Sequence, residues 1–426
     1  MLYVRKNVKK LTITGGNIYE QIGSGVVFRA FEDRGLGIDN ALFGVHLKYE
    51  LSENWSIYGM SGKQKNRLDL YEPVITASKM EGYLKLDDDL QMVPGMGVMN
   101  RTLDEASMTS VVTQINSYDL EDRFYPKYNV YAGSFYNTTT YKNLTWYLEY
   151  AMKSSEAIRD ETTSLSNRNG SLLFTTLGFS RKGIGLIGQY KRTENFSLRV
   201  SPDMVLLNGM INFLPPLTRQ NTYRLTSRYA AAALPLGEEA FQLDLVMKPA
   251  KGLNIDLNLS HVNDLDGTKL FREIYAEAKI KMNKKLKVIP GFQYMEYNRG
   301  VYENKPPVII TVTPFFESIY KISRKKSLRM EISYHYTEQD FGSWAWALLE
   351  YNVAPNWSFS VSDMYNIKPK KTDKLHYPTI FAGYTKGGNR YTLAYVKQVE
   401  GIVCTGGVCR YEPAFSGVRF SLTSSF

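Results

Sequence analysis

Ser333 and His335 are the residues whose types could most directly support catalysis, with Glu331 two positions earlier. A serine, a histidine and a carboxylate supply the nucleophile, base and orienting acid of many hydrolases. On a strand, however, side chains two positions apart lie about 7 Å apart. A nucleophile and its base need about 3 Å. We therefore expect these side chains to line a polar interior of the protein rather than to form a catalytic site. We predict that the chain is not an enzyme.

Cys404 and Cys409 enclose the loop Thr-Gly-Gly-Val, whose central glycines allow a tight turn. A disulfide could close this loop, and outside the inner membrane such a bond persists. Two free thiols are the alternative. Neither a histidine nor a third cysteine lies nearby in the sequence, so we predict no metal or redox role for the pair.

The remaining motifs do not point to a cofactor. The acidic clusters 87–89 and 263–267 offer oxygen ligands for calcium, but the second has no distal glutamate of an EF-hand loop, and solvated loops are the favoured interpretation. The sequence Gly23-Ser24-Gly25 is not followed by the Lys-Ser/Thr of a phosphate loop. The net charge of 52 − 42 = +10 is spread over turns rather than along one stripe, so we expect no nucleic-acid binding.

Strict alternation of apolar and polar residues indicates that the elements that position these side chains are β-strands. Between residues 328 and 337 the even positions are all apolar or aromatic and the odd positions all polar, which is the pattern of a half-buried strand. The same pattern recurs at 43–51, 241–248 and 253–260. These strands are about 10–15 residues long, whereas soluble sheets favour ~5–6 residues and a bilayer-crossing strand needs ~9–11.

The connections support the same interpretation. Short polar turns, as at 283–285 and 323–326, alternate with longer connections such as 153–170 and 298–307. Outer-membrane barrels have this arrangement of tight periplasmic turns and long external loops. We therefore predict an all-β protein: one transmembrane, antiparallel, up-and-down β-barrel of about 16–20 strands spanning residues 1–426. The polar residues predicted to face its interior are His46, Lys48, Glu50, Asp244, Asn254, Asp256, Asn258, Arg329, Glu331, Ser333 and His335.

Residues 196–236 break the alternation. They contain Pro202, Pro215, Pro216 and Pro235, and proline cannot sit within a central ladder. Our hypothesis is a long loop folded into the barrel interior, and an external surface loop is the alternative.

The two ends of the chain differ in character. The first residues contain neither the apolar core nor the cleavage site of an export signal, so we expect an N-terminally truncated sequence. The last ten residues form an alternating strand ending on a terminal phenylalanine. This ending resembles the C-terminal signal of bacterial outer-membrane proteins, which their assembly machinery reads. The residues that carry the signal are Gly417, Phe420, Leu422 and Phe426.

Residues 16–29, residues 32–42 and the cysteine-containing tail 404–413 together resemble an uncharacterised family of Bacteroidota outer-membrane β-barrels, a domain of unknown function. The resemblance extends from residue 11 to residue 426. It implies a fold and an outer-membrane location in a Gram-negative cell, and it supplies no activity or functional residues.

Three functions remain open at this point. The first hypothesis is a porin-like channel or transporter for small polar solutes, because a barrel of this size has an interior that side chains alone cannot fill. The second is a structural or assembly component of the cell envelope that binds a protein partner. An outer-membrane hydrolase is the least favoured. The partners we expect are outer-membrane lipid, lipopolysaccharide and, during biogenesis, the barrel-assembly machinery.

Overall fold

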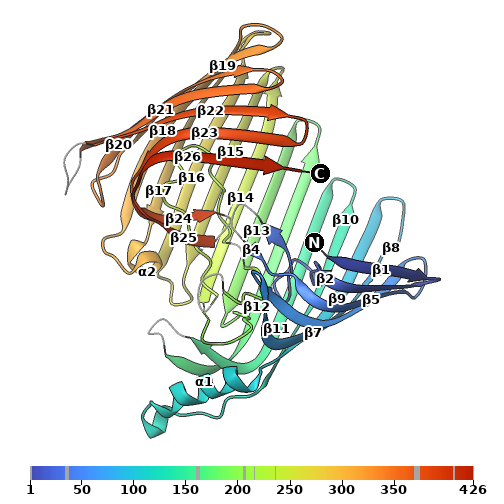
Figure 1. The fold of residues 1–426 in the computed structure, drawn as a ribbon. Helices are drawn as coiled ribbons and strands as arrows, with labels where there is room; N and C mark the ends of the chain where they lie inside the picture. Colours follow the sequence, from blue (N-terminus) through green and yellow to red (C-terminus); the bar gives the residue numbers. More distant parts are fainter. Residues whose placement is uncertain are drawn as a thin grey trace.

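The computed structural model describes residues 2–33, 38–159, 164–204, 208–214, 216–235, 237–368, 375–405 and 408–425. Strands dominate this part of the chain (Figure 1). None of its helices has the length and apolar character needed to cross a membrane.

Most strands belong to one sheet of 22 strands, in which neighbours along the chain pair with one another in antiparallel register. The last strand of the sheet, β26, pairs with β23, and two hairpins, β3–β4 and β24–β25, form separate small sheets. The elements are β1 (Tyr3–Val8), β2 (Leu11–Ile18), β3 (Glu32–Asp33), β4 (Ile38–Asp39), β5 (Leu42–Glu50), β6 (Trp55–Asn66), β7 (Asp69–Gly82), β8 (Leu84–Lys85), β9 (Leu90–Thr102), α1 (Glu105–Asn116), η1 (Leu120–Asp122), β10 (Asn129–Tyr141), β11 (Leu144–Arg159), β12 (Leu165–Arg181), β13 (Ile184–Glu194), β14 (Gly237–Ala250), β15 (Leu253–Asn263), β16 (Lys269–Lys281), β17 (Leu286–Tyr297), α2 (Arg299–Glu303), β18 (Ile309–Lys321), β19 (Lys326–His335), β20 (Ser343–Val353), β21 (Trp357–Lys368), β22 (His376–Lys386), β23 (Asn389–Gln398), β24 (Gly401–Thr405), β25 (Val408–Glu412) and β26 (Phe415–Ser424).

The predicted all-β, antiparallel, up-and-down fold is confirmed. The sheet contains 22 strands, a few more than the expected 16–20. On β6 and β7, Gly59, Ser61, Thr76 and Ser78 occupy the face that is apolar on other strands. Small and polar residues there make the alternation hard to detect, although the paired register is regular.

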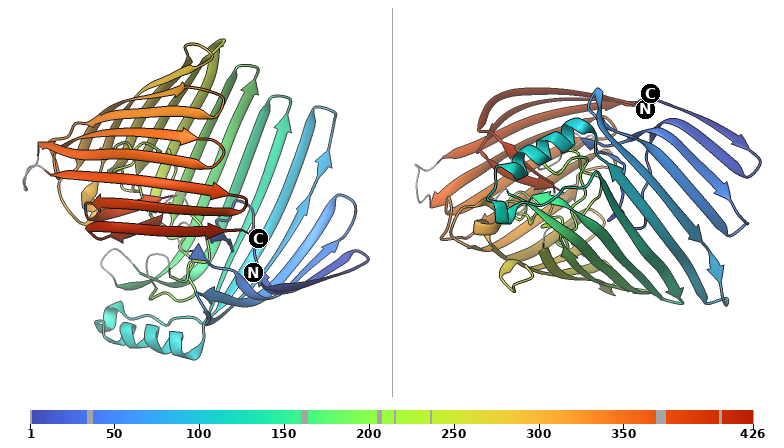
Figure 2. Two further views of the ribbon diagram at one scale, coloured as in Figure 1. Left: turned by 45° about the horizontal axis from the view of Figure 1, so that its top comes forward. Right: turned by 90° about the horizontal axis from the view of Figure 1, so that it is seen from below.

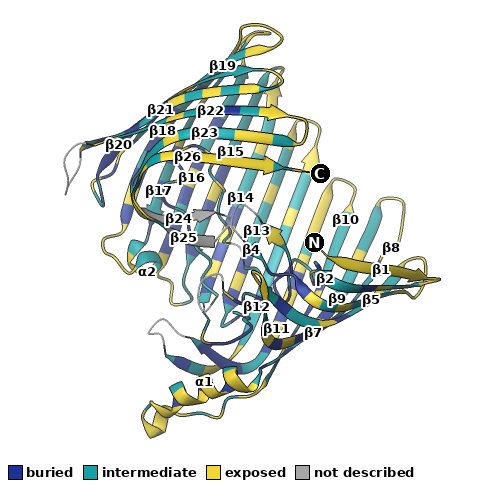
Figure 3. Cartoon of the chain, in the orientation of Figure 1, coloured by how far each residue is buried: buried dark blue, intermediate teal, exposed yellow. Residues whose placement is uncertain are grey.

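The two faces of the sheet have opposite character, and their exposure inverts the usual rule for soluble proteins (Figure 3). On β19, Ile332 is 47% exposed, whereas its polar neighbour Glu331 is buried. On β5, Val45 is 52% exposed, while His46 is half-buried. We call the face with exposed apolar side chains the outer face and the opposite one the inner face.

The buried core lies inside the curve of the sheet, where two connections fold back against the inner face (Figures 1 and 2). The first inward segment comprises residues 19–33 and 38–41, between β2 and β5. The second comprises residues 195–204, 208–214 and 216–235, between β13 and β14. Phe28 and Phe196, one from each segment, are buried in the same cluster with inner-face residues of the strands. The two largest apolar clusters therefore lie between the inward segments and the sheet, rather than between two sheets packed face to face.

Helix α1, in the connection between β9 and β10, is capped by Asp104, whose carboxylate accepts from the amides of Ala106 (3.1 Å) and Ser107 (3.3 Å). Burial raises the pKa of this carboxyl, but hydrogen bonds from Ser107 and Ala106 outweigh it and leave the pKa below its ordinary 3.8. The ionised Asp104 cap therefore stabilises α1 fully above the pKa that Asp104 has in the unfolded chain. This stabilisation is lost as the pH falls through the lower pKa of Asp104 in the folded chain.

We expect Asp104→Ala to reduce the local stability of α1 by about 1 kcal/mol at pH 7, and by less at pH 3, because a protonated carboxyl caps weakly. Amide hydrogen exchange of residues 105–116 at the two pH values measures this. Asp104→Asn retains a capping oxygen without a titrating group, so its α1 should show little pH dependence. Equal protection in Asp104→Ala and the parent at pH 7 would contradict the assignment.

Candidate functional site

The residues predicted to face the interior all lie on the inner face of their strands, the face opposite the exposed apolar side chains. Their burial differs with position. Asn258, Glu331, Ser333 and His335 are buried; His46, Lys48, Asp244, Asn254, Asp256 and Arg329 are partly exposed; and Glu50, at the end of β5, is exposed.

The inner face of the sheet forms the wall around the interior, and we call it the inner wall. Glu149 of β11 holds the tip of the first inward segment on this wall. The Glu149 carboxylate accepts from the Ser24 amide (3.0 Å), from the Ser24 hydroxyl (2.5 Å) and from the Tyr147 hydroxyl (2.6 Å). Gly23 has φ +53°, and a Cβ there would lie 2.4 Å from a Glu149 oxygen. The glycine thus permits both the left-handed turn and the close approach.

The first and second inward segments are bonded to each other. The buried Asn212 side chain donates to the carbonyl oxygens of Val26 (2.9 Å) and Phe196 (3.0 Å) and accepts from the Leu198 amide (3.1 Å). Backbone bonds from Arg29 to Ile211 (2.9 Å) and from Phe213 to Gly25 (3.1 Å) add to this contact. Two loops far apart in the sequence therefore form one unit.

The second half of the second inward segment contacts the inner faces of β15, β16 and β17. The Arg219 guanidinium lies 3.5 Å from a carboxylate oxygen of Asp256 and 4.0 Å from the centroid of the Tyr275 ring. Asn221 donates to Glu273 (2.6 Å), a buried carboxylate on β16. Polar wall residues thus serve as anchoring points for this segment.

Beyond these contacts, the inner wall carries a row of ion pairs on β18, β19 and β20. Arg329 approaches Glu317 (3.0 Å), Glu331 (2.8 Å) and Glu350 (3.7 Å). The Arg329 and Glu350 side chains remain 27% and 30% exposed. On β16, Lys279 pairs with Glu277 at 2.6 Å and is 35% exposed. This part of the wall combines fixed charges of both signs with access to solvent.

A buried ion-pair cluster lies where β9 and β11 meet the second inward segment. The Glu156 carboxylate contacts Arg101 and, at 2.8 Å, Lys153. Lys153 also donates to the backbone oxygen of Ser197 (3.0 Å). All three charged side chains are nearly inaccessible, so Glu156 compensates two buried cations, and Lys153 links the wall to the segment.

Ser333 and His335 share the inner face, as their spacing requires, but His335 Nδ1 is hydrogen bonded to the hydroxyl of Thr313 (2.8 Å) on β18. Glu331 is paired with Arg329. His335 and Glu331 are therefore each bonded to a residue of the sheet that is not part of the Ser-His-Glu triad considered above. Within the described residues no group of three His, Cys, Asp or Glu is placed to hold a metal ion.

Cys404 and Cys409 are Cα partners across the β24–β25 hairpin. Their side chains lie outside the described part of the structure, so the disulfide stays a prediction. Paired positions on adjacent strands are within the Cα separation that a disulfide needs.

We expect both cysteines of the isolated protein to resist alkylation in denaturant until a reductant is added, and then to gain two adducts. Mass spectrometry of the alkylated protein measures this. Cys404→Ser should expose Cys409 to alkylation without reductant, and two freely alkylated cysteines in the untreated parent would exclude the disulfide.

The C-terminal strand β26 contains Gly417, Phe420 and Leu422, and the last two project from the outer face, 65% and 56% exposed. Phe426 lies outside the described residues. The strand has the predicted alternation, and its role as an assembly signal stays a prediction.

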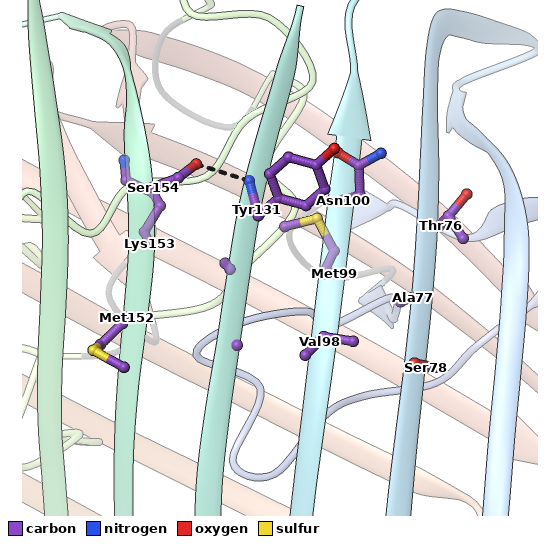
Figure 4. A pocket seen from close by; sticks show the side chains of 12 residues that line it. Thr76, Ala77, Ser78, Val98, Met99, Asn100, Tyr131, Met152, Lys153 and Ser154 are labelled. Carbon is purple, nitrogen blue, oxygen red and sulfur yellow. Dashed lines mark hydrogen bonds between the residues drawn. The ribbon is translucent and has the colours of Figure 1, made fainter.

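A groove of about 660 Å³ crosses the outer face over β7, β9, β10 and β11 (Figure 4). Val98, Tyr131 and Met152 line it with exposed apolar side chains, and Ser154 accepts from the Tyr131 amide (3.0 Å). Gly133 forms part of its lining, where a side chain is missing from the outer face. Because the groove opens on the outer face, it is separate from the inner-wall charges.

The sequence suggested that the glycines at 23 and 25 allow a close backbone approach inside the barrel, with Arg29 in the lumen, but it did not predict that residues 19–33 and 38–41 form a packed connection. Its signal is the run Val26-Val27-Phe28, which does not alternate although it lies between two alternating strands. All three residues are buried. Such a run, next to a glycine-rich turn, could have indicated a connection that folds onto a core.

The fold is therefore that of an antiparallel meander sheet with an apolar exterior and a polar, partly filled interior. The chain matches the model of a family of unknown function, DUF6029, over residues 1–426, and it belongs to that family. The expected membership of an uncharacterised family is thereby confirmed, while the bacterial group remains a prediction. No curated protein matches the chain.

Several solved structures are similar to the chain at low identity. The translocation pore of the P pilus usher PapC has a TM-score of 0.49 and 9% identity, covering 99% of this chain and 85% of that chain. OccAB4 from Acinetobacter baumannii has a TM-score of 0.41 and 8% identity, covering 87% and 96%. The siderophore receptor PirA from the same organism has a TM-score of 0.39 and 8% identity, covering 100% and 73%. With TM-scores below 0.5, the fold class rests on the strand pairing of the chain itself.

Proposed function

We propose that the protein is an integral outer-membrane β-barrel that acts as a channel or transporter for small polar solutes. The observation that carries this proposal is the inverted polarity of the sheet: apolar side chains such as Val45, Ile332 and Phe420 are exposed, while charged side chains face inward. An exposed apolar band of this extent is costly in water and favourable in lipid.

The inner wall is suited to polar solutes because it combines paired charges with partial solvent access. Arg329, Glu350 and Lys279 carry fixed charges that can replace part of the hydration of a passing solute. The inward segments occupy the space near β6–β12 and β14–β20, so the resting interior is narrowed. We further propose that the protein has no catalytic role, since Ser333 and His335 lie two positions apart on β19, too far for a direct bond, and His335 is fully buried.

Reconstitution of the purified protein into planar lipid bilayers tests the proposal. We expect discrete current steps in salt solution, small for a barrel of this strand number because of the inward segments. Detergent-solubilised protein that inserts but never produces steps, even after removal of the second inward segment, would contradict the channel.

A second candidate is a non-conducting structural component of the envelope. It is favoured by the dense bonding of the inward segments to each other and to the wall, as at Asn212 and Glu149. In that case the interior is a packed core and the connections bind a partner. A protein that co-purifies with the barrel in stoichiometric amount, together with silent bilayers, would support this alternative.

A further inference from the structure

The sheet has two edges with no second partner among the described residues. Strand β1 pairs with β2, and β26 pairs with β23; no pairing joins β1 to β26. Every residue of β1 is exposed, and Val418 and Phe420 of β26 are 69% and 65% exposed. The two termini lie near each other, beside the gap between these edges (Figure 2).

The direction of the two edges follows from the pairing. Strand β8 continues β7 along β9, so it adds no position across the sheet, which leaves 22 − 1 = 21 positions. All neighbours are antiparallel, and the first and last of an odd number of antiparallel strands run the same way. Strands β1 and β26 are thus parallel to each other and cannot close an all-antiparallel barrel by pairing directly.

A lipid environment does not tolerate such edges. Unpaired amide and carbonyl groups facing hydrocarbon cost several kcal/mol each, so spanning sheets are closed. Bacterial single-chain barrels contain an even number of strands. Both requirements are met if an odd number of further strands lies between β26 and β1.

We propose that an additional strand region of the same full-length polypeptide, preceding residue 1, fills this gap and pairs antiparallel with both β1 and β26. The inference rests on the proposed membrane location and not on conductance. Strand β1 enters the sheet at the end where the long connections lie, because its other end meets β2 through the tight turn at 9–10. A connection before Tyr3 at that end would bring a preceding strand against the free edge of β1 in the required antiparallel direction.

The outward side chains of both edges define what the filling strand must present. Val4 and Val8 are exposed on β1, and Phe420 and Leu422 are exposed on β26. A strand between them needs apolar residues at every second position to continue the outer face.

Cysteine pairs in the full-length protein, in its own outer membrane and with Cys404→Ser and Cys409→Ser in the background, test the gap. Adjacent strands are about 4.8 Å apart, and strands flanking one inserted strand about 10 Å. A disulfide requires Cα atoms within about 7 Å. We therefore expect Val4→Cys or Val8→Cys to form no disulfide with Phe420→Cys or Leu422→Cys under oxidant. The matched control is Leu393→Cys with Phe420→Cys, which are partners across β23 and β26 and should cross-link.

A photoreactive side chain at Val4 identifies the occupant independently of any disulfide. After irradiation and digestion, we expect the adduct to contain a peptide from the segment preceding residue 1. An efficient disulfide between β1 and β26 would overturn the proposal, as would an adduct with a β26 peptide, a segment following residue 426 or another protein. A silent bilayer recording would contradict the channel but leave this result unchanged, so the two proposals fail separately.

Discussion

Replacing residues 203–218 by a short Gly-Ser linker is expected to raise the single-channel conductance of the reconstituted protein by at least ~10-fold, because an unobstructed barrel of more than about 16 strands holds an aqueous channel. The deletion removes Asn212 and the backbone contacts of Ile211 and Phe213. The first inward segment then loses its bonded neighbour and keeps its bonds to the sheet, at Ser24 to Glu149 and at Glu20 to Lys79.

The matched control replaces the exposed turn Leu120–Asp122 by glycines, which leaves both inward segments intact. Its conductance should equal that of the parent. The point variant Asn212→Ala, which loses three hydrogen bonds, should give intermediate behaviour with frequent brief openings. If the 203–218 replacement inserts normally and conducts as the parent does, these residues do not restrict the interior.

Glu156→Ala is expected to have the largest effect of any single substitution on stability. It leaves Arg101 and Lys153 buried without their shared carboxylate, and breaking a buried pair costs about 3–5 kcal/mol. Urea unfolding of the protein in lipid vesicles, followed by tryptophan fluorescence, measures the loss. The anchoring of the second inward segment through Lys153 and Ser197 should weaken with it.

Asp88→Ala is the control for charge removal, because Asp88 pairs with Lys85 at 2.7 Å on a short turn where its side chain is 93% exposed. Exposed pairs contribute about 0–1 kcal/mol, so its unfolding midpoint should stay near that of the parent. A Glu156→Ala protein as stable as Asp88→Ala would show that the cluster is solvated or rearranged.

Much of the sheet could be predicted from local pattern because the side-chain period of a strand is two. The alternation around Glu331 and Ile332 assigned opposite environments to neighbouring residues, and the paired register agrees. Where that pattern weakens, as at Ser61 and Thr76, strands are harder to recognise from the sequence, since small polar residues on the outer face remove the contrast between the faces.

The candidate site was predictable only in part. Sequence placed Arg329 and Glu331 on the inner face but could not show that one arginine approaches three glutamates on three strands. Those contacts depend on the register between strands, which side-chain alternation fixes only to within an even shift. His335 is a second example, because its partner Thr313 lies on the neighbouring strand.

The sequence by itself determined which face of each strand meets an apolar surrounding, because that information is contained in adjacent residues. The sequence also suggested that residues 196–236 fold into the interior, but only the tertiary structure decided which contacts hold the inward segments there. The contacts from Asn212 to Val26 and from Ser24 to Glu149 join residues 186 and 125 positions apart. Such bonds form only once the sheet has curved and brought distant connections together, so no local pattern of residues specifies them.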